Sequence, residues 1–66
     1  MDNNLIANGM VKGMEMMGAK FIKSNSNYLF FDIKIGSEID NQEKLKNAKD
    51  AFVKILGVSI KVRKVI

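Results

Sequence analysis

Residues 28–35, YLFFDIKI, alternate two sets of side chains and predict a β-strand more clearly than any other part of the chain. Every second residue is apolar: Leu29, Phe31, Ile33 and Ile35. The residues between them are Tyr28, Phe30, Asp32 and Lys34. Because successive side chains of a strand point to opposite faces, we expect the first set to face a core and the second to face away. The outward set therefore begins with two aromatic rings.

The segment before this strand predicts the other half of a β-hairpin. Residues 24–27, SNSN, are four turn-forming residues in a row. Residues 19–23, AKFIK, form a short β candidate in front of that turn. We expect Lys20 and Ile22 of this strand to lie on the outward face of the hairpin.

The segment after the strand predicts a helix. Gly36 ends the strand, and Asp40 followed three residues later by Glu43 has the form of a capping box with Asp40 as the N-cap. Apolar residues at helical spacing then predict a buried stripe of Leu45, Ala48, Phe52, Ile55 and Leu56. The opposite side carries compensating charges that we interpret as a solvated face: Glu43, Lys46, Asp50 and Lys54. Gly57 suits the C′ position of this helix.

Residues 58–63, VSIKVR, alternate cleanly and predict the last strand. Continued alternation turns Lys64 toward the core. We therefore expect a bulge, a frayed strand end or an inward lysine that blunts the edge of the sheet. Val65 and Ile66 follow and need cover from another surface.

A first helix is predicted from a cap at Asp2, Asn3 or Asn4 to Met17, with Gly18 as the stop. Its apolar side is wide: Ile6, Met10, Gly13, Met14 and Met17, extended by Leu5, Gly9 and Met16. The opposite side keeps Asn8, Val11, Lys12 and Glu15. A helix on one small sheet buries a stripe of about 100° or slightly more. The surplus indicates a second contact surface.

Gly9 and Gly13 share one face of this helix, and each costs about 1 kcal/mol of helix propensity relative to alanine. We favour the explanation that they accommodate the sheet beneath the helix. The alternative is the seam of a helix–helix dimer, although small residues four apart drive association most strongly in membranes.

These elements predict a single domain over residues 1–66 with the order α-β-β-α-β. The strand–helix–strand tail predicts a right-handed crossover that makes its two strands parallel. Both helices then lie on one face of a three-stranded mixed sheet. The expected fold class is a two-layer α+β unit.

A chain of 66 residues is shorter than the roughly 70–80 residues at which one apolar core comfortably stabilises a fold. It has no cysteine and no histidine, so a disulfide is impossible and a zinc site nearly so. Self-association or binding to another macromolecule remains, and we expect a homodimer. Its candidate interface residues are Leu5, Gly9, Gly13, Met16, Val65 and Ile66.

Catalysis is hard to place in this sequence. Without histidine or cysteine, the commonest proton shuttle and the commonest thiol nucleophile are missing. The carboxylates are spread over caps, solvent faces and a loop, and none has the apolar surroundings that raise a catalytic pKa. Glu38 and Asp40 form an oxygen-poor loop without EF-hand spacing. We expect no enzyme activity, no metal and no cofactor.

The formal net charge is +4, and the excess lies in residues 34–66, where eight bases face four acids. Such a bias attracts nucleic acid, an anionic membrane or an acidic protein surface.

No apolar stretch is long enough for a membrane span, and the first residues lack the basic start of a signal peptide. We expect a cytoplasmic protein with no membrane partner. Residue types with A- and T-rich codons supply 35 of the 66 residues, which suggests a low-GC bacterium or one of its phages or mobile elements.

The outward face of the sheet is the candidate binding surface. Its candidate residues are Tyr28, Phe30, Lys34, Lys61, Arg63, Lys20 and Ile22. A bare face with aromatic residues is rarely left uncovered in monomeric proteins. We favour a small non-enzymatic regulator or inhibitor that binds another protein and is itself a homodimer. The alternative is binding of single-stranded nucleic acid, with bases stacked on the rings and lysines at phosphates.

Overall fold

The computed structural model describes residues 3–66, which form two helices and three strands in the predicted order. In chain order the elements are α1 (Asn3–Met16), β1 (Ala19–Ser24), β2 (Tyr28–Lys34), α2 (Gln42–Leu56) and β3 (Ser59–Val65). Asp2, one of the three predicted caps of the first helix, lies outside the described residues.

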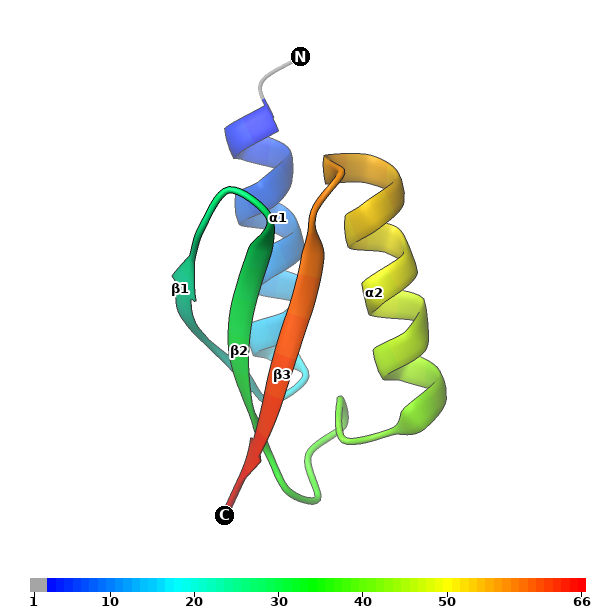
Figure 1. Ribbon diagram of the computed structural model, residues 1–66. Helices are drawn as coiled ribbons and strands as arrows, with labels where there is room; N and C mark the ends of the chain where they lie inside the picture. Colours follow the sequence, from blue (N-terminus) through cyan, green and yellow to red (C-terminus); the bar gives the residue numbers. More distant parts are fainter. Residues whose placement is uncertain (1–2) are drawn as a thin grey trace.

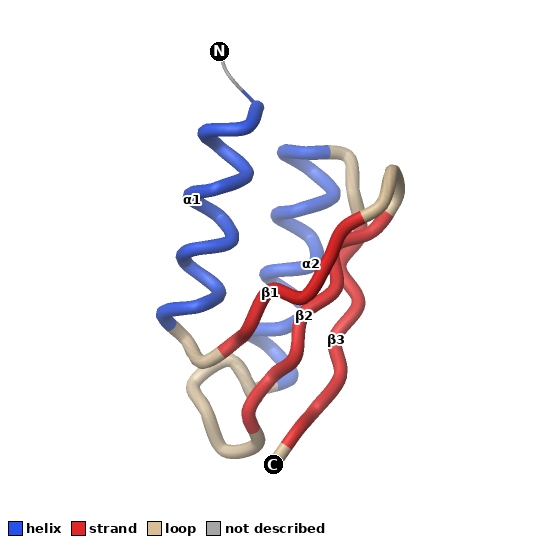
Figure 2. The backbone as a smooth tube through the Cα atoms, turned by 90° about the vertical axis from the view of Figure 1, so that its left-hand side faces the viewer, coloured by secondary structure: helices blue, strands red, loops and turns tan. Residues whose placement is uncertain are grey.

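The three strands form one sheet with β2 in the middle (Figure 1). β1 pairs with β2 in the antiparallel direction, and β3 pairs with β2 in the parallel direction. Both helices cover the same face of this sheet, and the other face carries no helix (Figure 2). The predicted fold class, a two-layer α+β unit with a mixed sheet, is confirmed.

The core lies between the sheet and the helices. Its buried members are Met14, Ala19, Phe31, Ile33, Ile39, Phe52 and Ile60. The ring of Phe31 sits at the centre, edge-on to Phe21 at 5.6 Å and to Phe52 at 6.1 Å between ring centroids. The predicted inward position of Ile35 is wrong, because β2 ends at Lys34 and the Ile35 side chain is 54% exposed.

α1 is rotated relative to the prediction. Met14 is buried, and Val11, predicted on the solvent side, packs against the core together with Met10 and Met17. The predicted apolar arc was wide enough to fit several rotations, and packing around Met14 selects one of them. This rotation turns Leu5 and Met16 to the exposed side of the helix.

α2 begins one residue later than predicted. Its N-cap is Asn41, whose Oδ1 accepts the backbone N–H of Lys44 at 3.1 Å. Asp40, the predicted cap, instead accepts the backbone N–H of Gly36. Phe52 is buried as predicted, whereas Ile55 at the margin of the stripe is 55% exposed. The predicted C′ residue Gly57 is confirmed in the left-handed conformation with φ 69°.

β3 continues in register with β2 as far as Val65, opposite Lys34, so the strand neither bulges nor frays at Lys64. Lys64 pairs with Ile33 and therefore lies on the helix side of the sheet. The expected turn of this lysine toward the helix side is confirmed, and its side chain is 57% exposed there. Its ammonium group reaches the carboxylate of Asp40 at 2.9 Å. A bulge occurs instead in β1, between Phe21 and Lys23.

Candidate functional site

The sheet face opposite the helices, here called the outer face, collects every residue that was predicted for binding. Strand register, together with the depression that Ile22 lines, places eleven side chains there: Lys20, Ile22, Lys23, Tyr28, Phe30, Asp32, Lys34, Ser59, Lys61, Arg63 and Val65. Seven of them are the predicted binding residues. Ser59 was also expected to be there, and Asp32 was expected as an outward residue of β2. Lys23 is the residue that sequence reasoning missed.

The bulge in β1 explains the position of Lys23. Strict alternation from Ala19 and Phe21 would turn Lys23 toward the helices, but Ile22 is an extra residue without a partner in the pairing. Lys23 therefore pairs with Phe30 and joins the outer face. Bulges often re-aim a side chain in this way. The pairing with β2 reveals the bulge, whereas the local sequence of β1 carries no signal for it.

Two lysines lie over the two aromatic rings of the outer face. Nζ of Lys23 is 5.2 Å from the Phe30 ring centroid, and Nζ of Lys61 is 4.7 Å from the Tyr28 centroid. The two rings are tilted by 51° with their centroids 6.2 Å apart. A cation–π contact at an exposed site contributes about 0.5–1 kcal/mol. These contacts are therefore weak enough for a ligand to replace.

Asp32, the one acidic residue of the outer face, is held by Arg63 from the neighbouring strand. The guanidinium makes two hydrogen bonds, Nε to Oδ1 at 3.1 Å and Nη2 to Oδ2 at 3.0 Å. The side chain of Asp32 is 17% exposed and that of Arg63 is 75% exposed. Hydrogen bonding to Asp32 raises the pKa of Arg63 above its ordinary value. The carboxylate is neutralised on this face, and it projects little free negative charge.

A shallow depression of about 440 Å³ lies on the outer face around Phe30. Ile22 and Lys23 line it from β1, and Lys61 and Arg63 line it from β3. Its volume falls in the range of small-ligand sites, roughly 300–1,000 Å³. The depression gives a flat group a place beside the Phe30 ring.

Four of the six predicted dimer residues share the solvent side of α1. They form what we call the α1 stripe: Leu5, Gly9, Gly13 and Met16. At roughly 3.6 residues per turn these four positions fall within about 80° of the helix circumference. The Leu5 and Met16 side chains are 71% and 86% exposed. Apart from the adjoining residues and the backbone of α1 itself, a Cβ at Gly9 or at Gly13 would meet no heavy atom of residues 3–66 within 4 Å.

This geometry corrects the favoured explanation of the two glycines. Neither Gly9 nor Gly13 accommodates the sheet, because space is open at both positions. The remaining predicted dimer residues, Val65 and Ile66, lie elsewhere. Val65 follows the outer-face register opposite Lys34, and Ile66 ends the chain beyond it. The structure therefore does not bring the six predicted dimer residues together.

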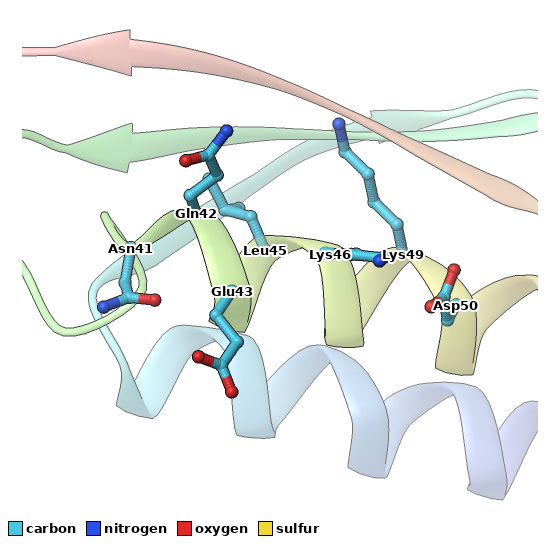
Figure 3. Close-up of a pocket in the computed structure, with 7 residues that line it drawn as sticks. All are labelled: Asn41, Gln42, Glu43, Leu45, Lys46, Lys49 and Asp50. Carbon is cyan, nitrogen blue, oxygen red and sulfur yellow. The ribbon is translucent and has the colours of Figure 1, made fainter.

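A second depression, about 780 Å³, runs along the exposed side of α2 (Figure 3). Its lining residues are Asn41, Gln42, Glu43, Leu45, Lys46, Lys49 and Asp50. Glu43 and Asp50 balance Lys46 and Lys49 in charge. Gln42 and Lys49 extend to one side of the helix, and Glu43 extends to the opposite side (Figure 3). Side chains that diverge and compensate in charge give a solvated surface rather than a converging site.

Within residues 3–66, no group of three or more His, Cys, Asp or Glu side chains is close enough to hold a metal ion. Neither helix of this part of the chain is long and apolar enough to cross a membrane. Comparison of the chain with protein-family models, with curated proteins and with solved structures finds no match.

Proposed function

We propose that this chain is a small non-enzymatic regulator or inhibitor that acts by binding another protein, and that it is itself a homodimer. The observation that carries the proposal is the α1 stripe, an apolar line of Leu5, Gly9, Gly13 and Met16 on the side of α1 that faces solvent. In the homodimer this stripe contacts a second copy. A target protein with an apolar helix face takes the place of that copy.

The glycines of the stripe support this arrangement. Each glycine in a helix interior costs about 1 kcal/mol relative to alanine. Among the described residues, Gly9 and Gly13 have no neighbour outside α1 that an alanine methyl group would displace, so packing there does not offset this cost. A second helix backbone that comes close along the stripe gives both glycines a role.

The ends of the stripe are self-complementary. Two α1 helices that cross in antiparallel directions near residues 9–13 bring Leu5 of one copy beside Met16 of the other. A two-fold axis repeats this contact, so each dimer contains it twice. Methionine is flexible and fills irregular gaps, which suits a surface that binds a second copy and a different target in turn.

The small size of the core also supports a dimer, because the interface would bury additional apolar surface. Seven apolar residues are buried in the part of the chain that the structure describes, and the sequence has no cysteine for a disulfide. A domain of this size buries a smaller fraction of its surface than a larger one does, and its net stability is correspondingly low. Covering Leu5 and Met16 in a dimer adds apolar burial that the chain alone lacks.

Sedimentation equilibrium tests the dimer. We expect twice the monomer mass of 7.4 kDa at micromolar concentration, and a thermal midpoint that rises with protein concentration. Leu5→Lys should give a monomer. Val53→Lys, the matched control on the exposed side of α2, should remain a dimer. A wild-type chain that sediments as a monomer at every concentration contradicts the proposal.

Alanine substitution of the glycines gives an independent test, because a monomer and the proposed dimer predict changes in stability of opposite sign. In a monomer, Gly9→Ala and Gly13→Ala each increase stability by about 1 kcal/mol, because only helix propensity changes. In the proposed dimer the added methyl groups separate the helices, so dissociation increases.

Affinity capture from cells with the wild-type chain and with Leu5→Lys then tests the target. A target of the stripe is recovered with the first and lost with the second.

A further inference from the structure

The net charge of the molecule is concentrated on the outer face. Five of the eleven basic residues lie there with one of the seven acidic residues, which leaves six bases and six acids for the rest of the chain. The outer face thus accounts for the whole formal charge of +4. The sequence showed only a bias toward the second half of the chain. Folding gathers five basic residues, drawn from both halves of the chain, into one surface.

We propose that the outer face binds single-stranded nucleic acid. Phe30 and Tyr28 stack against bases, and the surrounding ammonium groups meet phosphates. These ammonium groups belong to Lys20, Lys23, Lys34 and Lys61. The proposal concerns the sheet, whereas the α1 stripe lies on the helix side, so each surface is free to act without the other.

The arrangement of lysines and rings fits this ligand. Lys23 and Lys61 lie over Phe30 and Tyr28 at cation–π distances. Stacking of a base on an exposed ring is stronger than a cation–π contact at the same ring. A base therefore displaces the ammonium group from the ring face. The lysine remains within reach of the phosphate that follows the base.

The depression around Phe30 provides room for the stacked base. Ile22 and Lys23 border it on one side, and Lys61 and Arg63 border it on the other. The bulge in β1 places two consecutive residues along this border. Ile22 and Lys23 together enclose the Phe30 ring more than a single residue of a regular strand would.

Asp32 does not oppose the ligand strongly, because its carboxylate already accepts two hydrogen bonds from Arg63. The ion pair lies in the next row of the sheet, opposite Lys20, and Phe30 stands between Lys23 and Lys61. Arg63 is thereby partly occupied, and the phosphate contacts fall mainly to the lysines.

The shape of the face favours single strands over duplexes. Bases in a duplex are stacked on one another and hidden from a flat sheet, whereas bases of a single strand can turn onto aromatic side chains. Duplex readers insert a helix or a two-stranded ribbon into a groove. The outer face is a sheet surface without a helix over it (Figure 2). An acidic protein would meet the lysines as well, but a single strand offers a planar base at every nucleotide for the two rings.

Fluorescence anisotropy with a labelled oligothymidylate of about 12 nucleotides tests the proposal, since single-strand sites commonly span about 4–16 nucleotides. Four phosphate contacts predict a loss of affinity of about 50-fold between about 50 mM and 200 mM salt, at a slope of roughly −0.7 per contact. The exchange of Lys23 and Lys61 for glutamine removes two contacts, so the loss should shrink to about 7-fold.

A matched pair of substitutions separates a site from general attraction. Lys46→Gln with Lys54→Gln on α2 lowers the net charge by the same amount, but it should leave the affinity and the salt dependence nearly unchanged. Tyr28→Leu with Phe30→Leu should weaken binding about tenfold or more while the salt dependence stays the same, because stacking releases no counterions. Circular dichroism checks that each variant is folded. The lysine pairs test the proposal even if the ring variant is unfolded.

Several outcomes would overturn the proposal. One is the absence of oligothymidylate binding at about 50 mM salt, where phosphate contacts are strong. Equal losses from the two lysine pairs would mean that only net charge matters. Duplex of the same length that binds as tightly would exclude stacking on the rings. A polyglutamate peptide that binds as tightly as the oligonucleotide would assign the face to an acidic protein. Each of these results leaves the dimer at α1 untouched.

Discussion

Lys64 near the end of β3 places its Nζ 2.9 Å from Oδ1 of Asp40, in the loop that leads to α2. The other carboxylate oxygen of Asp40 accepts the backbone N–H of Gly36 at 2.9 Å. One side chain thus joins the turn after β2, the approach to α2 and the end of the sheet. The same contacts explain how a lysine is tolerated on the helix side of β3.

Stability should fall at acid pH through Asp40. The hydrogen bond from Gly36, followed by that from Lys64, lowers the pKa of Asp40 below its ordinary value of 3.8. A carboxyl whose pKa is lower in the folded chain contributes stability above the unfolded pKa. This contribution is lost as pH falls through the folded value. Urea midpoints measured from about pH 5 down to about pH 2 should therefore decrease.

The variant Asp40→Asn isolates this contribution. It should be less stable than wild type at neutral pH and lose less stability on acidification. Asp50→Asn is the control, because Asp50 makes no ion pair within residues 3–66. If both variants show the wild-type pH dependence, Asp40 is not the group that titrates.

Gly18 should resist substitution because of contacts within the chain itself, whereas Gly9 and Gly13 have open space around them. Its φ is +105°, and a Cβ at this position would collide with Cβ of Ser37 and approach its Oγ to 2.8 Å. Residues in such sparsely populated backbone regions cost about 1–3 kcal/mol. Gly18→Ala should therefore lower the free energy of unfolding by at least that amount. The double variant with Ser37→Gly removes the collision but keeps the φ strain, so it should recover only part of the loss.

The fold could be predicted because its signals are local. Alternation in residues 28–35, the four turn formers before them and Gly57 after α2 each act within a few residues. The rotation of α1 could not be fixed, because its apolar arc is wide and Val11 is as apolar as its neighbours. Contacts with Met14 decide that rotation, and they form only when the sheet is present.

The sequence predicts that the outer face carries aromatic and basic residues, but it does not predict all of those residues. Strand alternation identifies Tyr28, Phe30, Lys61 and Arg63. Lys23 depends on a bulge that arises from pairing between two strands. The concentration of charge on one face likewise depends on which strands are neighbours, and this is a property of the topology rather than of any segment.

Contacts of Asp40 with residues outside α2 determine which residue caps this helix, and the contribution of the cap to stability can be measured. Asp40 and Asn41 are both good caps, but Asp40 is engaged by Gly36 and Lys64, so Asn41 caps the helix. Asn41→Ala should cost about 0.5–2 kcal/mol of stability. Gln42→Ala, in the first turn of the same helix, should be nearly neutral because alanine is a good helix former. An Asn41→Ala variant with wild-type thermal stability would argue against this cap.

The isoleucines on either side of the end of β2 should respond to the same substitution by different amounts. Ile33 is fully buried, whereas Ile35 lies beyond the end of β2 and is mostly exposed. Ile33→Val removes a buried methyl group and should cost about 0.5–1.5 kcal/mol. Ile35→Val should change the free energy of unfolding by less than about 0.5 kcal/mol, as exposed substitutions usually do. Chemical denaturation of both variants measures the difference. Strict alternation to residue 35 predicts equal losses, so equal losses would show that Ile35 is covered by a further surface in solution.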